Sequence, residues 1–219
     1  GISRAHGASG VAPIWVERDG SNRIICVAGA NDAMTPAGAI SALEHLENYQ
    51  IVIGQLEIPQ EVTIAAFKKA KDFGAITILN PAPFALISPD LISVSDWIVP
   101  NESEFAGMHP QGLGPTSDEN ILELSATLKA RFAVTLGEKG AAFTTRDGEI
   151  RRVAAPQVKA IDTTGAGDAF VGAFAVGLAA HLSDEKAIAL GCACASESVT
   201  RKGTQSSYPT PAQAQEILR

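Results

Sequence analysis

Short apolar runs alternate along this chain with longer segments whose apolar positions recur every three or four residues. The short runs predict buried strands, and the longer segments predict helices. The predicted strands cover residues 51–56, 75–79, 96–99, 132–136, 141–145 and 149–153. The predicted helices cover residues 59–73, 116–130, 166–181, 184–201 and 211–218. Apolar strands that alternate with helices indicate a mostly parallel central sheet with helices on both faces, which is a three-layer α/β/α fold.

The N-terminal part carries two further patterns. Residues 11–28 predict a hairpin, because two apolar segments flank the turn sequence Asp19-Gly20-Ser21-Asn22. Thr35 and Pro36 predict the start of a helix with Thr35 as its N-cap. The apolar face of that helix is expected to carry Ile40, Leu43 and Leu46. The chain has no internal repeat or low-complexity linker, so residues 1–219 are expected to form a single domain that includes the hairpin.

Composition narrows the class of protein. The chain has 219 residues, of which 46% are hydrophobic and 19% charged, which indicates a globular protein. The net charge of −7 argues against a nucleic-acid surface. No apolar run is long enough to span a membrane, and no signal peptide is visible. Three cysteines without zinc or disulfide spacing indicate reduced core thiols in a cytoplasmic protein. The four histidines show no ligand spacing.

Polar residues gather where the predicted strands end. They are Glu57, Asn80, Asn101, Glu104 and the turn at 135–140. Ligands of open α/β sheets bind at the carboxyl ends of the strands. The pattern therefore predicts one active site at this edge of the sheet.

The stretch from Asp162 to Phe170 carries the strongest signal for chemistry. It follows a β-like run at 149–158 and opens a long helix. Gly165 and Gly167 permit a tight turn whose N–H groups are open to a ligand, and a helix N-terminus attracts anions such as phosphate. Asp168 lies in the first helical turn, where it either complements the helix dipole or takes a proton from an attacking hydroxyl.

The full string Asp-Thr-Thr-Gly-Ala-Gly-Asp-Ala-Phe resembles the C-terminal signature of the ribokinase-like (PfkB) sugar kinases. The resemblance implies transfer of the γ-phosphoryl group of ATP to a primary hydroxyl of a sugar, with O5 of D-ribose as the first choice. Asp168 would be the catalytic base and would contact the sugar. The amides of Gly165, Ala166 and Gly167 would form an anion hole. The alternatives are another kinase of the family, such as a fructokinase or 2-keto-3-deoxygluconate kinase, and a non-catalytic nucleotide-binding remnant.

Asn101 and Glu104 resemble a second motif of the family, Asn-x-x-Glu. Their spacing alone predicts a capping box. The resemblance implies that Glu104 also helps to place Mg²⁺ and that Asn101 lies near the phosphates. A carboxylate suits Mg²⁺, and the two roles are compatible.

The turn after strand 132–136 either is a plain left-handed turn or lies along the nucleotide, as the resemblance implies. Its residues are Thr135, Gly137, Glu138, Lys139 and Gly140, of which Lys139 could be merely solvated. Glu57 either contacts the sugar, as the resemblance implies, or is an ordinary charged residue just before the helix predicted at 59–73. Carboxylates accept hydrogen bonds from sugar hydroxyls.

The resemblance also implies a K⁺ site, formed by the first Asp of the signature and the C-terminal tail. The matching positions are Asp162, Thr164, Ser198, Arg201, Gly203 and Ser207. Most ligands would be carbonyl oxygens, which suit K⁺. The alternative is that Asp162 caps a turn and that a helix ends at Arg201-Lys202 before Gly203.

The resemblance extends from about Gly10 to the C-terminus and includes Gly29-Ala30-Asn31-Asp32 and Asn80-Pro81-Ala82-Pro83. Family members usually begin earlier, with an opening strand, a Gly-Gly motif and more lid strands. Because this sequence lacks these parts and begins without Met, it is expected to be a fragment or a processed chain. The hairpin at 11–28 is then expected to be part of a lid, through which family members often form homodimers.

Overall fold

The computed structural model describes residues 4–16 and 22–217. Six strands form its main sheet: β3 (Ile51–Gly54), β4 (Ile76–Leu79), β5 (Trp97–Ile98), β6 (Arg131–Thr135), β7 (Ala141–Thr144) and β8 (Ile150–Val153). The strand order is β3-β4-β5-β6-β7-β8. The pairs from β3 to β6 are parallel, and the β6–β7 and β7–β8 pairs are antiparallel. The mostly parallel sheet is therefore confirmed.

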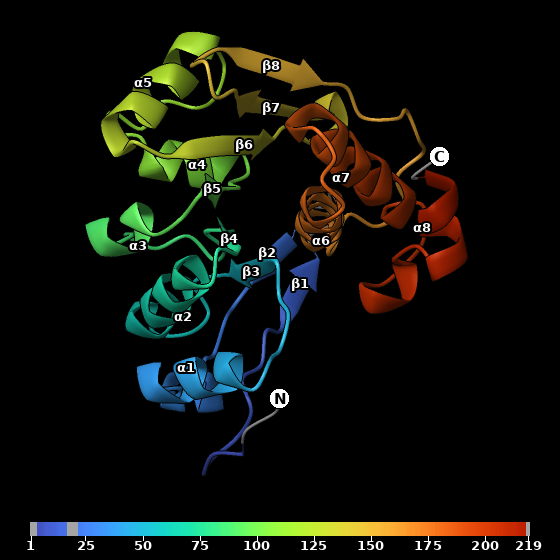
Figure 1. The fold of residues 1–219 in the computed structure, drawn as a ribbon. Coiled ribbons are helices and arrows are strands. Elements are labelled where there is room, and N and C mark those ends of the chain that lie inside the picture. Colours follow the sequence, from blue (N-terminus) through green and yellow to red (C-terminus); the bar gives the residue numbers. More distant parts are fainter. Residues whose placement is uncertain (1–3, 17–21, 218–219) are drawn as a thin grey trace.

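Helices cover both faces of this sheet, which confirms the three layers (Figure 1). One layer contains α2 (Gln60–Asp72), α3 (Pro89–Ser93), α4 (Glu102–Met108) and α5 (Asp118–Leu128). The other contains α6 (Ala166–Ala179) and α7 (Asp184–Ser198). The helix α1 (Pro36–Glu44) packs beside α2, and α8 (Pro211–Ile217) packs against α7. Three short 3-10 helices, η1 (Gly29–Ala33), η2 (Gly137–Lys139) and η3 (Gln205–Ser207), lie in the connections.

The two faces of the sheet are buried by alternate side chains of its strands. In β6, Ala133 belongs to the apolar cluster with Phe174 of α6. Its neighbours Phe132 and Val134 belong to the cluster with Phe105 of α4, and the rings of Phe105 and Phe132 meet edge to face. Burying a large apolar side chain contributes roughly 1.5–3 kcal/mol, whereas a surface ion pair contributes about 0–1 kcal/mol. Apolar burial therefore holds the layers together.

Element boundaries differ from the sequence prediction at several places. The helix that begins after Thr35 ends at Glu44, so Leu46 lies beyond it and is exposed. The β-like run 149–158 was wrong beyond Val153, where β8 ends and the chain leaves the sheet. The helix predicted at 184–201 ends at Ser198. Helix α3 was not predicted, although Ser88 caps it by accepting a hydrogen bond from the Leu91 amide, 3.2 Å away.

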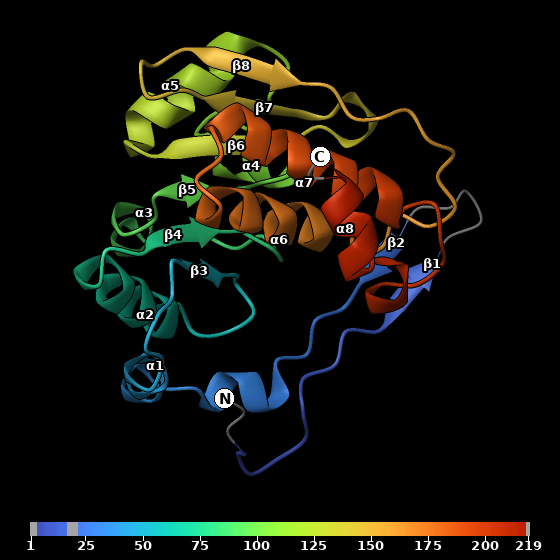
Figure 2. The same ribbon diagram turned by 45° about the vertical axis from the view of Figure 1, so that its right-hand side comes forward.

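The predicted hairpin is present as a two-stranded antiparallel ribbon of β1 (Ile14–Val16) and β2 (Asn22–Ile24). A bridge between Val11 and Val27 extends the pairing toward the rest of the chain. Of the predicted turn, Asp19, Gly20 and Ser21 lie outside the described residues. The ribbon lies apart from the main sheet, on the side toward which β4 and β8 point (Figure 2).

Helices α6 and α7 approach each other closely at Gly177. A Cβ atom at Gly177 would lie 2.7 Å from the Cα atom of Ala187. We therefore expect Gly177→Ala to destabilise the fold by about 1–3 kcal/mol through overpacking, although alanine favours the helix by roughly 0.5–1 kcal/mol. Urea unfolding measures the change.

The matched control is Gly172→Ala in the same helix, because a Cβ atom there would meet no atom of the described chain within 4 Å. This control should stabilise the protein by roughly 0.5–1 kcal/mol. Equal stabilisation by both variants would contradict the close approach at Gly177.

Candidate active site

The predicted glycine turn is present at the start of α6. Gly165 is the N-cap with φ 80°, a left-handed conformation that glycine adopts without strain. The Ala166 amide donates to the Thr163 carbonyl at 3.2 Å, and the Ala169 amide donates to the Gly165 carbonyl at 2.9 Å. Gly167 lies in the first turn, where N–H groups have no intrahelical partner. A Cβ atom at Gly167 would meet no described atom within 4 Å, so a ligand can approach its backbone.

Asp168 follows directly in the first turn of α6. Its side chain is open to solvent on one side, and the protein packed around the rest of the carboxyl group raises its pKa by partial burial. A carboxylate with a raised pKa binds a proton more readily than an ordinary aspartate does. The turn thus combines an approachable amide with a potential base.

A cavity of about 570 Å³ opens at this turn. Seven of the sequence-predicted site residues line it: Asn101, Thr135, Gly137, Glu138, Gly140, Ala166 and Gly167. Within the described chain, Gly165, Lys139 and Asp168 are outside this lining. The structure therefore brings three separate motifs to one cavity, whereas Glu57 lines a second cavity and Asn80 and Glu104 line neither of the two.

The far end of the cavity was missed by the sequence prediction. One missed group lies on α7 and at its C-cap, and its members are Cys192, Ala195, Ser196 and Val199. Their spacing of three, four and seven residues is that of one helical face, and this signal could have found them. Burial raises the pKa of the Cys192 thiol to about 11, so this thiol remains protonated.

The other missed residues lie in the chain after β8 and beside the motifs. They are Glu102, Ala155, Pro156, Gln157, Val158, Ala160, Thr163 and Phe170. The segment after β8 was predicted as a strand, so its role as a cavity wall was hidden. The cavity is thus polar at the glycine turn and more apolar toward α7.

Asn101 and Glu104 form the capping box that their spacing predicted. The Asn101 side chain accepts a hydrogen bond from the Glu104 amide, and the Glu104 carboxylate accepts one from the Asn101 amide, each at 2.8 Å. Glu104 is 8% exposed, and burial raises its pKa, while the bond from the Asn101 amide opposes that shift. No described group of three or more His, Cys, Asp or Glu side chains is arranged to hold a metal. A divalent ion here would depend on phosphate and water oxygens in addition to Glu104.

The turn between β6 and β7 is fixed by backbone contacts. The Thr135 amide donates to the Pro100 carbonyl at 2.9 Å, and the Leu136 amide donates to the Gly140 carbonyl at 2.8 Å. Gly140 has φ 95°, and a Cβ atom there would lie 1.9 Å from the Val153 carbonyl oxygen. Only glycine fits this position, so the turn and the chain after β8 are held in direct contact.

The six residues predicted around a K⁺ ion lie in the loop before α6 and in the loop that runs from the end of α7 through η3, and the structure brings these two segments together. Asp162 accepts hydrogen bonds from the Thr164 and Gly203 amides, each at 3.0 Å. These two bonds, first that from Gly203, lower the pKa of Asp162 to about 2. Gly203 has φ 92°, in the left-handed region. The turn-capping role predicted for Asp162 is therefore present.

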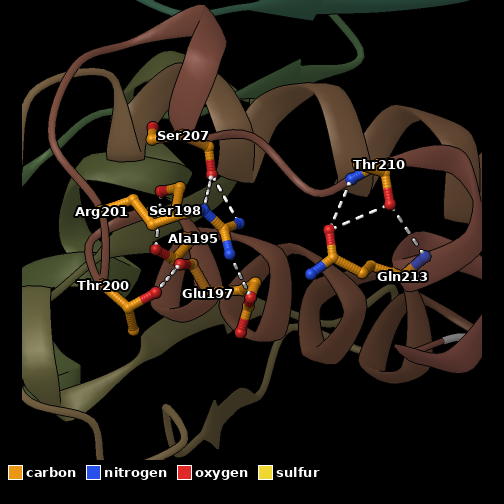
Figure 3. Close-up of polar contacts among 8 residues, drawn as sticks. All are labelled: Ala195, Glu197, Ser198, Thr200, Arg201, Ser207, Thr210 and Gln213. Atoms are coloured by element: carbon orange, nitrogen blue, oxygen red, sulfur yellow. Dashed lines mark hydrogen bonds and ion pairs between the residues drawn. The ribbon is translucent and has the colours of Figure 1, made fainter.

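Arg201 organises the second loop (Figure 3). Its guanidinium group donates to the Ser207 carbonyl at 2.8 Å and forms an ion pair with Glu197 at 2.7 Å. The Ser207 hydroxyl donates to the Thr204 carbonyl, and the Ser198 hydroxyl donates to the Ala195 carbonyl. The tail is thus tied to the end of α7.

A second cavity, of about 380 Å³, lies between the segments 10–12 and 26–28, which flank the ribbon, and the chain after β3. Glu57 lines it, together with Asn31, Asp32 and Cys26. Cys26 is exposed, whereas Cys192 and Cys194 are buried, so the prediction of core thiols was wrong for Cys26. The cavity provides carboxylate and amide acceptors suited to a polyol.

The mixed six-stranded sheet with helices on both faces is the ribokinase-like fold, which solved structures share with this chain. The family model described as "pfkB family carbohydrate kinase" matches residues 2–211. The chain belongs to this family of carbohydrate kinases. Within the described part of the chain, no helix is both long and apolar enough to cross a membrane.

Known relatives agree with this assignment. A ribokinase of Schizosaccharomyces pombe is 36% identical over 93% of this chain and 65% of its own length. A deoxyribokinase of Salmonella typhi is 39% identical over 96% of this chain and 70% of its own length. The chain therefore spans about two thirds of the length of these relatives.

Solved structures agree as well. The ribokinase of Arabidopsis thaliana, complexed with ribose and ATP, superposes with a TM-score of 0.87 at 31% identity, covering 98% of this chain and 70% of that one. The ribokinase of Thermotoga maritima superposes with a TM-score of 0.82 at 33% identity, covering 99% of this chain and 71% of that one.

We predict that Asp162 titrates with a midpoint near pH 2. Because its pKa in the folded protein is lowered, the bonds to the Thr164 and Gly203 amides stabilise the fold above the usual aspartate pKa of about 3.9 and are lost as pH falls through about 2. NMR shifts of the Gly203 amide against pH measure this midpoint. The variant Asp162→Ala should abolish the titration, and Asp72→Ala, at an exposed position, should leave it intact. A midpoint near 4 would contradict the two hydrogen bonds that Asp162 accepts from the Thr164 and Gly203 amides.

Proposed function

We propose that this chain carries the active site of an ATP-dependent sugar kinase. The observation that carries the proposal is the cavity that ends at the glycine turn of α6, with Asp168 in the first turn. A helix N-terminus favours a phosphate by its free N–H groups and its dipole. The acid beside it then has a chemical role, because its charge would otherwise oppose the bound phosphate.

Asp168 acts as the general base. It takes the proton of a primary sugar hydroxyl while that oxygen forms a bond to the γ-phosphorus of ATP. The bond between this phosphorus and the bridging oxygen breaks, and ADP leaves with the released charge. The raised pKa of Asp168 brings its basicity closer to that required of a base at neutral pH.

The amides of Gly165, Ala166 and Gly167 stabilise the charge on the transferred phosphoryl oxygens. Gly167 has the most open approach of the three, and the Ala166 amide has to leave the Thr163 carbonyl to take part. Mg²⁺ would neutralise the phosphate charge. Glu104 would hold it with the carboxylate oxygen that does not accept the Asn101 amide, and Asn101, which lines the larger cavity, would contact the phosphates.

ATP occupies the larger cavity with its base toward α7. Thr135, Gly137, Glu138 and Gly140 line the same cavity and lie along the nucleotide. Lys139 belongs to the same turn and reaches the nucleotide from outside the lining residues. The apolar end is suited to a purine, and the glycine turn is suited to the phosphates.

K⁺ would bind between the two segments that Asp162 joins. The carboxylate of Asp162 would supply negative charge, and the backbone carbonyls of Thr164, Ser198, Arg201, Gly203 and Ser207 would supply further oxygens. The Ser207 carbonyl already accepts two N–H groups of the Arg201 guanidinium, at 2.8 and 3.3 Å, so this contact would have to loosen for the oxygen to reach the ion. K⁺ activation can be measured against Na⁺ as the control.

D-Ribose is the proposed acceptor, and its hydroxyls contact Glu57 in the smaller cavity. The alternative acceptor is 2-deoxy-D-ribose, which the similarity to the Salmonella deoxyribokinase favours. A panel of D-ribose, 2-deoxy-D-ribose, D-fructose and 2-keto-3-deoxygluconate, assayed with ATP, Mg²⁺ and K⁺, separates these substrates. Binding of ADP without turnover on any sugar would support a non-catalytic nucleotide-binding protein instead.

The ribbon provides a surface for a homodimer. Val11, Ile14, Trp15, Ile25 and Val27 are 42–58% exposed. Pairing the ribbons of two copies would bury these side chains, and light scattering measures the resulting mass. The use of ATP and the free thiols fit a cytoplasmic enzyme.

We predict that Asp168→Asn lowers kcat by orders of magnitude and leaves the affinity for ADP largely unchanged, because the amide cannot accept the proton. Steady-state kinetics and calorimetry measure the two quantities. In the wild type, kcat should fall with acid at a higher pH than an ordinary aspartate would give, because its pKa is raised. The control Asp147→Asn, at an exposed turn, should change neither quantity. Equal losses of kcat and ADP affinity would count against the base role.

A further inference from the structure

Tyr208 lies at the glycine turn of α6, although it is separated from that turn by more than the length of α7. Its hydroxyl oxygen is 2.8 Å from the point where a Cβ atom of Gly165 would lie. The side chain is half-buried, and it follows directly after η3. The phenol oxygen therefore lies beside Gly165, in the turn at which the phosphoryl group is proposed to bind.

The backbone around Tyr208 is held in place. Ser207 is fully buried, and its carbonyl accepts the Arg201 guanidinium at 2.8 Å. The Ser207 hydroxyl donates to the Thr204 carbonyl at 2.7 Å, and the Thr204 Cβ atom lies 3.4 Å from the same Cβ point of Gly165. These contacts fix the loop that directs the ring toward the turn.

The hydroxyl of Tyr208 is a neutral donor near neutral pH. Burial, and then the negative charge of Asp168, raise the pKa of Tyr208. The influence of Asp168 also indicates that the phenol lies within the electrostatic reach of the proposed base. A neutral O–H group near an anion can donate a hydrogen bond without adding negative charge.

We propose that the Tyr208 hydroxyl donates a hydrogen bond to the transferred phosphoryl group, next to the amide of Gly167. This inference rests on the proposed kinase function and adds a side-chain donor to its anion hole. Tyr208 takes no proton and forms no covalent bond. Its contribution is greatest when negative charge develops on the phosphoryl oxygens in the transition state.

The test is Tyr208→Phe, which removes the hydroxyl and keeps the ring. We expect kcat to fall about 10- to 100-fold, the effect of losing one hydrogen bond to a charged group. The affinity for ADP should be unchanged, because ADP lacks the transferred group, and this also shows that the variant is folded. The matched control is Tyr49→Phe, since the chain has two tyrosines and Tyr49 stacks on Phe73 at a ring distance of 4.7 Å.

The pH profile distinguishes a phosphoryl donor from a residue that only orients Asp168. If the hydroxyl donates to the phosphoryl group, its removal lowers kcat by the same factor at every pH. The pH at which kcat falls with acid (the acid limb of the profile) then stays unchanged. A shift of the acid limb in Tyr208→Phe would overturn the proposal, because it would show that the hydroxyl acts through Asp168. Wild-type kcat in this variant would overturn it as well.

A second measurement needs no sugar turnover. Aluminium fluoride with Mg·ADP mimics the transferred phosphoryl group, and calorimetry measures how much it tightens ADP binding. In Tyr208→Phe this tightening should be about 10- to 100-fold smaller than in the wild type and in Tyr49→Phe. Equal tightening in all three proteins would overturn the proposal for Tyr208. If the wild type shows tightening but phosphorylates no sugar, the proposed kinase function fails and the role of Tyr208 at the anion site stands.

Discussion

The Asp162 carboxylate accepts two hydrogen bonds from backbone amides, and the arrangement of the site depends on this pair of bonds. One oxygen receives the Thr164 amide, and the other receives the Gly203 amide, 41 residues further along the chain. The first bond fixes the approach to the glycine turn, and the second fixes the tail that carries Arg201 and Tyr208. Because one carboxylate holds both segments, the glycine turn and the tail have a defined relative position before any ligand binds.

Much of the fold could be predicted from the sequence because apolar runs and glycine or serine boundaries are local signals. The predicted strands at 75–79 and 132–136 correspond to β4 and β6, and the Asn101–Glu104 spacing gave the capping box. The second half of the run 149–158 failed for a physical reason. Its apolar residues Ala155, Pro156 and Val158 line the larger cavity, and lining a ligand site and burial in a sheet favour the same side chains.

The candidate site could be predicted where a motif is contiguous, as at Gly165–Asp168, and was missed where it depends on packing between distant segments. The α7 face with Cys192 and Ser196 becomes a cavity wall only because α6 and α7 pack together. Tyr208 is recognisable only in three dimensions, since no spacing in the sequence relates it to Gly165. Sequence reasoning therefore located the turn and missed the groups that enclose the cavity beside it.

The contact beneath Gly140 has a mechanical consequence. Its missing side chain lets the β6–β7 turn rest directly on the backbone at Val153, so neither segment can move without the other. The β6–β7 turn and the chain after β8, which form two walls of the larger cavity, therefore move as one rigid unit. A ligand that binds against these walls orders few additional backbone torsions, so the conformational entropy lost on binding is small. The cavity is therefore largely preformed, and differences in affinity between ligands should arise from their contacts with its walls.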